Sequence, residues 1–518
     1  MHGDFSRETF DPAAGYRAVL LQQGRVLLDA DWNEQTAITA RHDEVRTRDV
    51  VGHAGGPVDA AAFAVTDATG TPATDTAWAD LHLSPGRFYV HGVLVEVPAV
   101  SPGPPAGPAL GPSLADQPFL PQTGSLPGLA EPSADGRYAV VLDASTRHVT
   151  ADEAPRLLES ALGGPDTTTR AQTTWQVRLE PAGPTDVCAS LAGAAWLSRT
   201  PPTMTASLVE PDPTSDPCAI STAEGYRRLE NQLYRVQVAD VDATGGAQVV
   251  WSRENGSVVA GLVQIVALSG PQPRPDAELH LDREGRDAEL SFGEGDVVEV
   301  TSRDRELHGL PALLGTAGAP DGLVLPVTWL GSADADPGTA DVANLGQAPI
   351  VRRWDGGPTA ASTTEHELED GIQVAFGSGG EFRVGDHWLI PARTVRLVYG
   401  VSVLGGTIEW PAVGGVPQPK PPQGPVVHST TLAVLQRAGG GSGTWSVVSD
   451  CRRLTPPLTE MVSIDLLGGD GQESLPGQPL DEPVRVVVRN GGLGVDGARV
   501  RFDAPDGHLD RVGAPSTG

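Results

Sequence analysis

The chain has 518 residues, enough for roughly three or four domains, with 66 acidic and 36 basic side chains. A net charge of −30 disfavours nucleic acid and anionic membrane surfaces as partners, because both repel an acidic protein. No segment approaches the ~20 consecutive apolar residues needed to span a bilayer, so we expect no membrane insertion. The 63 glycines and 46 prolines favour many turns over long helices.

The first 55 residues are expected to form an attachment segment, made of a tight turn and then a helix. The turn is centred on Gln23 and Gly24, between two short apolar runs. Asp31 is the expected N-cap of the helix, and Glu34, three residues later, is its capping-box partner. Gly52 suits the end of the helix. Nothing that resembles a signal peptide precedes this segment.

Residues 56–135 are expected to contain a β-hairpin and a long loop. Apolar residues alternate over residues 81–98, which is typical of a hairpin. Residues 101–135 are rich in Pro, Gly, Ser and Ala and predict a surface loop.

Residues 136–460 predict a β-rich body, with two modules of the sandwich or barrel type. Short alternating runs are separated by turns rich in Gly, Asp and Pro. One short helix is expected over residues 151–162, and Pro-rich loops over 200–218 and 405–425. Residues 258–268 predict a buried strand. The other expected strands are 137–143, 175–179, 233–238, 249–251, 278–281, 297–301, 322–329, 373–376, 395–399, 430–436 and 444–448.

The residue pattern changes at about residue 461, and residues 461–518 resemble part of an immunoglobulin-like or invasin-like domain. Strands are expected near residues 484–488, 493–495 and 498–502. A sandwich of this type needs about seven strands, and only three or four are visible. Either the natural chain continues, or this segment pairs with another chain.

Three cysteines are too few for a disulfide framework. Cys188 and Cys218 flank a Pro-rich stretch and could pair in an oxidising environment. Three reduced thiols, as in a protein made in the cytoplasm, are the favoured interpretation. Asn255-Gly256-Ser257 matches a glycosylation sequon, but the Asn-Gly pair more simply predicts a turn.

The chain contains no recognisable catalytic motif. Gly-x-Ser-x-Gly and the phosphate-binding Gly-Lys-Ser/Thr are both absent. Residues 366–370 begin like a metalloprotease helix but lack the second histidine. Residues 29–33 imitate an EF-hand loop, but Glu34 stands where that loop needs glycine. Asp334, Asp336 and Asp341 could form a calcium loop, although acidic loops are usually only solvated. We therefore expect no enzyme activity, no cofactor and no metal.

Two pairs of carboxylates, Glu294 with Asp296 and Glu367 with Glu369, are candidates for the pair that a glycosidase needs. Both lie in turn-like segments and are expected to face solvent. Sugar stacking is one role for the 10 tryptophans, but core packing is favoured. The polar blocks 229–232 and 252–255 are interpreted as buried hydrogen-bond networks or as assembly contacts.

Several segments together carry a family resemblance. They are residues 3–35, 83–92, 161–167, 175–177, 229–236, 251–258, 385–393 and 408–411. This set resembles a bacterial family of unknown function associated with phage-tail-like contractile injection systems. Residues 22–35, QQGRVLLDADWNEQ, are also similar to the particle-attachment ends of phage tail fibres.

The resemblance implies a structural component of a contractile injection particle, resembling a baseplate or tail-fibre subunit. Its partners would be baseplate, tube or spike subunits, and the chain would form a homo-oligomer, with a trimer suspected. Synthesis and assembly would occur in the cytoplasm, with release as part of an extracellular particle. The residues expected to make the assembly contact are Phe5, Tyr16, Leu20, Gln23, Gly24, Arg25, Leu27, Asp29, Asp31, Trp32, Asn33 and Glu34.

Two alternatives stay open. A carbohydrate-binding or carbohydrate-active surface protein would have a groove lined by exposed tryptophans and two convergent carboxylates. A free adhesin is disfavoured by the missing export signal.

Overall fold

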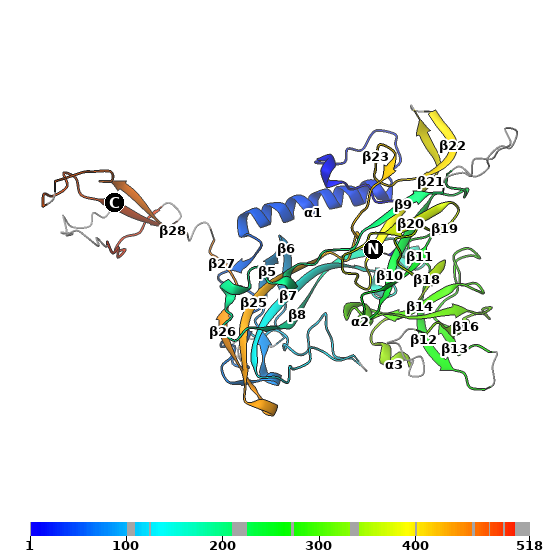
Figure 1. Ribbon diagram of the computed structural model, residues 1–518, viewed down its shortest axis with the longest axis horizontal. Coiled ribbons are helices and arrows are strands. Elements are labelled where there is room, and N and C mark those ends of the chain that lie inside the picture. The colour runs from blue at the N-terminus through cyan, green and yellow to red at the C-terminus, as the bar shows by residue number, and fades with distance from the viewer. Residues whose placement is uncertain are drawn as a thin grey trace.

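The protein is mainly β, with one long helix (Figure 1). The computed structural model describes residues 2–502 except 101–108, 124–125, 210–224, 271–273, 332–340, 399–400, 458–460, 476 and 491–492. In the described part, no helix is long and apolar enough to cross a bilayer.

Helix α1 (Asp29–Val51) follows the short 3-10 turn η1 (Pro12–Ala14) and the expected turn. It begins earlier than predicted, because Trp32 N–H already donates to the Leu28 carbonyl. Leu28 is therefore the N-cap, and Asp31 lies at the third helical position, where it accepts from Leu28 N at 3.3 Å. The assignment of Asp31 as N-cap was wrong. The predicted end is confirmed, since Gly52 has φ +92° and donates to the Arg48 carbonyl.

The first β unit combines N-terminal strands with strands from near residue 450. Two larger sheets and a two-stranded ribbon build it. Strand pairing joins residues 54–97 to residues 427–455 in space. The five-stranded sheet has the order β3 (Thr76–Ala77), β26 (Thr444–Asp450), β25 (Val427–Ala438), β7 (Gly136–Val149) and β8 (Arg170–Ala182). The four-stranded sheet has the order β27 (Leu454–Thr455), β1 (Ala54–Pro57), β5 (Gly86–Val90) and β6 (Val93–Val97), and the ribbon is β2 (Val65–Thr66) with β4 (His82–Leu83).

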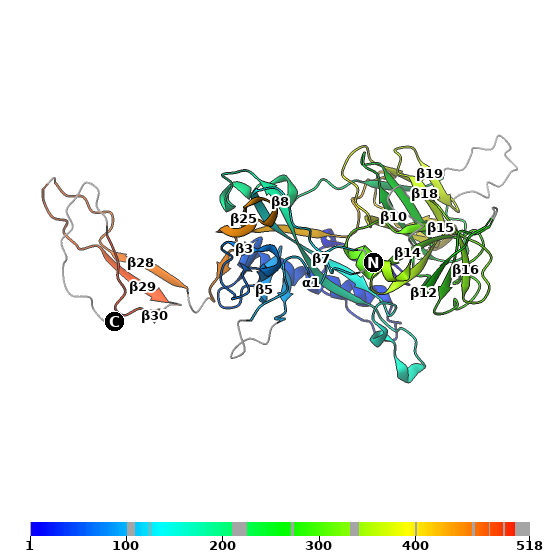
Figure 2. The same cartoon turned by 90° about the horizontal axis from the view of Figure 1, so that it is seen from below.

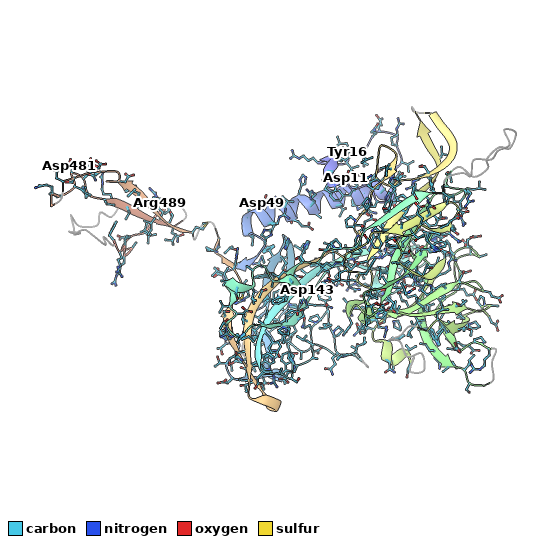
Figure 3. The ribbon with its side chains drawn as sticks, in the orientation of Figure 1. Asp11, Tyr16, Asp49, Asp143, Asp481 and Arg489 are labelled. Atoms are coloured by element: carbon cyan, nitrogen blue, oxygen red, sulfur yellow. A yellow bond between two sulfur atoms is a disulfide. The ribbon has the colours of Figure 1, made fainter. Side chains whose placement is uncertain are left out.

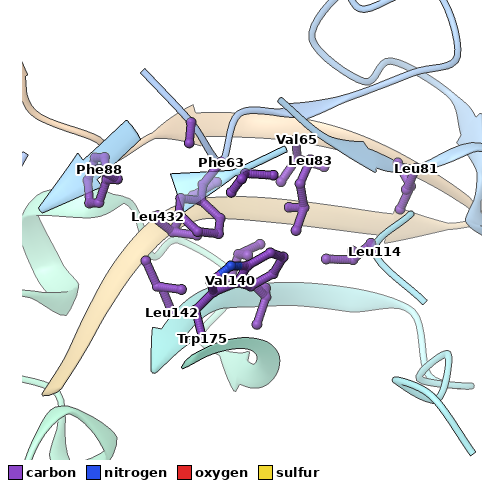
Figure 4. Close-up of a cluster of buried hydrophobic side chains, with 14 of the residues drawn as sticks. Phe63, Val65, Leu81, Leu83, Phe88, Leu114, Val140, Leu142, Trp175 and Leu432 are labelled. Carbon is purple, nitrogen blue, oxygen red and sulfur yellow. The ribbon is translucent and has the colours of Figure 1, made fainter. Parts of the chain in front are cut away.

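A large apolar core lies between these sheets (Figure 4). Phe63 packs edge-on against Trp175, with ring centroids 5.0 Å apart. Part of the predicted surface loop 101–135 is also buried here: Gln117 exchanges two hydrogen bonds with the backbone of Val177, at 2.7 and 2.8 Å. The prediction of a purely surface loop was wrong, because this glutamine satisfies the outer edge of β8.

The second β unit lies within residues 204–424 and contains two sheets and a closed barrel, as the sandwich or barrel prediction implied. One sheet has the order β18 (Gly356–Ala360), β11 (Ala247–Ser252), β10 (Gln232–Val241), β21 (His387–Val398) and β22 (Val401–Ile408). The other has the order β19 (His366–Glu369), β20 (Ile372–Phe376) and β9 (Met204–Leu208). The barrel is β12 (Val259–Ala267), β13 (Ala277–Leu281), β16 (Val324–Trp329), β15 (Leu313–Ala317), β14 (Val297–Ser302) and β17 (Pro349–Trp354).

Smaller elements connect these strands. The short helices are α2 (Arg303–Leu307) and α3 (Val342–Leu345), and the ribbon is β23 (Ala412–Val413) with β24 (Val416–Pro417). The 3-10 turns are η2 (Trp78–Asp80), η3 (Pro155–Leu157), η4 (Ser160–Leu162), η5 (Cys188–Leu191), η6 (Ala195–Leu197) and η8 (Gly440–Ser442).

Several local predictions were wrong. Residues 151–162 form the two turns η3 and η4 instead of a helix, since Pro155 supplies no backbone donor. The expected loops 200–218 and 405–425 contain β9 and the β23–β24 ribbon. Strand β12 is buried only near its start, and Val263 is 62 % exposed.

The cysteine predictions were also wrong. Cys188 in η5 forms a disulfide with Cys451, just after β26, with Cα atoms 5.2 Å apart. Cys218 lies outside the described residues. The partner of Cys188 is 263 positions away, and only the packing of η5 against β25 brings it near.

The C-terminal strands form a separate three-stranded sheet, of β28 (Val462–Gly468), β29 (Arg485–Asn490) and β30 (Leu493–Gly494). This sheet extends away from the rest of the chain in both views (Figures 1 and 2). The described residues 498–502 form no strand, unlike the prediction.

Candidate interaction surface

The first residues of the chain insert between strands of the same chain. Gly3 and Asn255 exchange two hydrogen bonds, at 3.3 and 2.9 Å. His2 Nε2 lies 3.0 Å from Gln237 Oε1, and the Phe5 ring packs edge-on to His148 at 5.8 Å. Residues 2–10, which we call the N-terminal arm, are therefore part of the body of the protein.

The arm also holds the start of α1. Asp29 accepts hydrogen bonds from the Ser6 backbone and hydroxyl, at 2.9 and 2.6 Å. Partial burial acts to raise the pKa of Asp29, but the Ser6 hydrogen bonds outweigh it and lower the pKa. Glu34 accepts from the Thr9 hydroxyl at 2.5 Å instead of capping the helix. Asp29 and Glu34 thus fix the helix to the arm.

Residues 16–28, which we call the N-terminal loop, project from the outer side of α1. Figure 3 shows Tyr16 beyond the helix, on the side away from the sheet that carries Asp143. Gly24 has φ +71° and Arg25 N–H donates to the Gln22 carbonyl at 3.2 Å, which confirms the predicted turn. Apart from this turn, residues 16–28 form no helix or strand, so the two sides of the loop are not paired as a strand ladder.

The N-terminal loop and the first turn of α1 expose a run of large apolar side chains. Leu20 and Val26 are each 83 % exposed, and Trp32 is 68 % exposed. Surface leucines occur singly in many proteins, whereas a contiguous apolar patch marks an interaction site. The full set is Tyr16, Leu20, Leu21, Val26, Leu27, Leu28 and Trp32.

The twelve residues predicted for the assembly contact fall into two groups. Those that face solvent are Tyr16, Leu20, Gln23, Gly24, Arg25, Leu27, Trp32 and Asn33. Those used within the chain are Phe5, Asp29, Asp31 and Glu34. The prediction did not include Leu21 and Val26, although the two apolar runs beside the turn contain them.

The polar block 252–255 belongs to an internal network, whereas Leu229, Glu230 and Asn231 of the other block are exposed. Arg253 makes two hydrogen bonds to the Glu369 carboxylate, at 2.9 and 2.8 Å, and the Tyr234 hydroxyl donates to the same group at 2.8 Å. Burial, together with the Glu369 charge, raises the pKa of Tyr234. Asn255, at φ +52°, occupies the predicted Asn-Gly turn.

The expected solvent-facing position of Glu369 was wrong, because this network covers it. Asp296 instead caps a turn, through a hydrogen bond from Gly293 N at 2.7 Å. Neither carboxylate is free in a groove, so the described structure offers no glycosidase pair at these positions.

The residues of the three metal motifs considered above form other structures, where they lie in the described part of the chain. Residues 366–369 form strand β19, so no metalloprotease helix exists there. Residues 29–33 form the first turn of α1. Asp341 caps α3, while Asp334 and Asp336 lie outside the described residues. Over the described part of the chain, no group of three or more His, Cys, Asp or Glu residues is placed to hold a metal.

The tryptophans pack mainly inside, as predicted. Trp175, Trp251, Trp354, Trp388 and Trp445 are buried. Lys420 covers the half-buried Trp410 ring, with Nζ 4.9 Å from its centroid. Trp32 is the one tryptophan whose side chain is mostly exposed to solvent.

Searches of curated proteins and of solved structures gave no significant match. A family model matches residues 1–188 and 185–446, which cover the N-terminal arm, the N-terminal loop and the two β units up to residue 446. The chain therefore belongs to DUF6519, a family of unknown function.

Proposed function

We propose that the protein is a non-enzymatic structural component of a contractile injection, phage-tail-like particle, and that it docks through the N-terminal loop to the baseplate or a neighbouring subunit. The observation that carries the docking is the exposed apolar run from Tyr16 to Trp32. The sequence resemblance supplies the kind of particle. The projecting C-terminal sheet suits a segment that points outward.

The loop has enough apolar surface to drive docking. A fully buried Leu or Val side chain contributes about 1.5–3 kcal/mol. Seven side chains that are roughly half to four-fifths exposed therefore offer on the order of 5–10 kcal/mol before ordering costs. Trp32, a large side chain beside the loop, is the residue type most often dominant at interfaces.

The test replaces exposed apolar residues without touching the N-terminal arm. Deletion of residues 1–50 would remove internal contacts as well, so point variants are the sharper probe. The triple variant Leu20→Ser, Leu27→Ser, Trp32→Ser is co-expressed with identified baseplate and tube subunits of a contractile particle. The control is Leu162→Ser, Val263→Ser, Val413→Ser, since these residues are also 62–69 % exposed but lie elsewhere.

Loss of co-purification in the loop variant, with the control and the unfolding temperature unchanged, is the expected result. Equal co-purification of both variants would refute docking through the loop. Light scattering of the full chain tests the homo-oligomer, for which a trimer is expected.

The carbohydrate alternative gains no support from a specific feature of the described residues. Trp32 alone is not a stacking platform, and Glu369 is paired with Arg253. Binding to a glycan array by both the unmodified chain and the loop variant would nevertheless support the carbohydrate alternative.

A further inference from the structure

A cavity of about 890 Å³, partly open to solvent, lies beneath α1, between the two β units. Its roof includes Ala37, Ala40, Arg41 and Glu44 of the helix. Its walls contain five of the twelve histidines of the chain: His2, His148, His308, His387 and His428. Histidine is the side chain that changes charge near neutral pH, so this clustering is chemically specific.

The same cavity leads to a stack of histidine rings at the C-terminal end of α1. His428 on β25 lies flat on His91, with ring centroids 4.7 Å apart and planes 11° apart. His91 contacts His53, just after the helix, at 5.2 Å. The backbone is equally tight, because His91 N–H donates to the His53 carbonyl at 2.6 Å. The end of α1, the turn between β5 and β6, and strand β25 therefore contact one another through the rings of His53, His91 and His428.

Protonation of this stack would meet little compensating charge. The groups that act on His91 are His428, His53 and Arg48, and Arg48 also acts on His428. Burial is the larger cause, and it lowers the pKa of both His91 and His428 below 6.5.

The carboxylates that face the cavity are largely engaged. Asp143 of β7 pairs with Arg178 at 2.7 Å, and Glu299 of β14 and Glu306 of α2 share Arg352, at 3.1 and 3.4 Å. Glu44 of α1 is flanked by Arg41 and Arg48 on its own helix. The cations that face the cavity are Arg41, Arg147, Arg235 and Arg383.

Few side chains of α1 are buried against the rest of the protein. Only Ala30 and Ile38 of its 23 residues are buried. Its main strand contacts are with β1 and β5, at the end where the histidines stack. Repulsion at that end therefore acts on the part of α1 that anchors it to the first β unit.

We propose that α1 is a pH-sensitive cover: mild acid protonates the histidines stacked at its C-terminal end, and their mutual repulsion lifts the helix and opens the cavity. Further histidines in the walls, such as His148, then become accessible to protons. In the closed form, burial lowers the pKa of His91 and His428 and so disfavours their charged forms. The open form binds more protons below pH 6.5, so opening increases as the pH falls through that value.

Hydrogen–deuterium exchange of the full chain between pH 7.5 and 5.0, corrected for intrinsic exchange rates, tests the cover. The protection of residues 38–51 is expected to fall about tenfold per pH unit below pH 6.5 for each proton that the open form takes up. The double variant His91→Gln, His428→Gln leaves His53 without another histidine to repel and is expected to keep its protection. His42→Gln, an exposed change on α1, is the matched control and should behave like the unmodified chain.

Unchanged protection of the unmodified chain down to pH 5.0 would overturn the proposal. An equal loss in the double variant would overturn it too. If the double variant does not fold at pH 7.5, the single variant His428→Gln is measured instead. A reduced pH slope in that variant supports the proposal, and an unchanged slope refutes it.

Discussion

The contact between Gly92 and α1 gives the sharpest test of how the helix is held. Gly92 lies in the turn between β5 and β6 with φ +93°, and a Cβ built there would lie 2.0 Å from the Glu44 carbonyl oxygen. Real Cβ contacts essentially never fall below 3.0 Å, so Gly92→Ala forces the helix or the turn to withdraw by at least about 1 Å.

Two costs add in Gly92→Ala. The left-handed backbone costs about 1–2 kcal/mol with a side chain present, and the steric overlap costs about 1–3 kcal/mol more. Gly163→Ala separates them, because Gly163 has nearly the same φ, +92°, and no atom within 4 Å of the added Cβ. We expect a loss of about 1–2 kcal/mol in unfolding free energy for Gly163→Ala and about 2–5 kcal/mol for Gly92→Ala.

Urea unfolding of both variants measures the difference, and hydrogen exchange shows where it acts. If Gly92→Ala displaces α1 without unfolding the rest of the protein, hydrogen exchange increases over residues 38–51 in Gly92→Ala but not in Gly163→Ala. Equal unfolding free energies and equal exchange for the two variants would refute close packing of α1 on this turn.

Three further changes probe the interior. Asp386→Ala leaves Arg199, which pairs with it at 2.6 Å, without its buried partner; urea unfolding should show a loss of about 3–5 kcal/mol, and a loss under 1 kcal/mol would contradict the pairing. Cys188→Ser with Cys451→Ser opens a crosslink across 263 positions and should lower the unfolding free energy by about 2–5 kcal/mol. Reductant should destabilise the parent chain similarly, and a parent chain indifferent to reductant argues against the disulfide. Burial lowers the pKa of His148 to about 3, so stability falls as pH drops from 6.5 towards 3; His148→Gln should flatten that slope, and an unaltered slope counts against its burial.

Local sequence patterns predicted elements that depend on neighbouring residues. The hairpin of β5 and β6 follows from alternation on both sides of His91 and Gly92, a turn that requires positive φ at both positions. The pairing of β10 with β11 follows in the same way from two alternating runs and a Gly-rich turn. The end of α1 follows from Gly52, because glycine adopts a conformation that other residues resist.

Position along the chain says little about contacts between distant segments. Cys188 finds Cys451 instead of Cys218 because η5 packs against β25. Glu369 becomes an internal ion-pair partner because β19 lies near Arg253 and Tyr234. Helix α1 has Leu28 as its N-cap instead of Asp31, and its first residue, Asp29, is bound by Ser6 of the distant arm.

Composition and spacing within a few residues are enough to predict a β-rich, acidic chain with an N-terminal helix and an apolar run beside a Gly24 turn. Tertiary structure alone decided which predicted contact residues are exposed, since Leu20 and Trp32 face solvent while Phe5 and Asp29 are held by the same chain. It also brought His53, His91 and His428 together. Such meetings arise when strands far apart in sequence pair to bury apolar surface and satisfy their backbones, a balance that no single segment encodes.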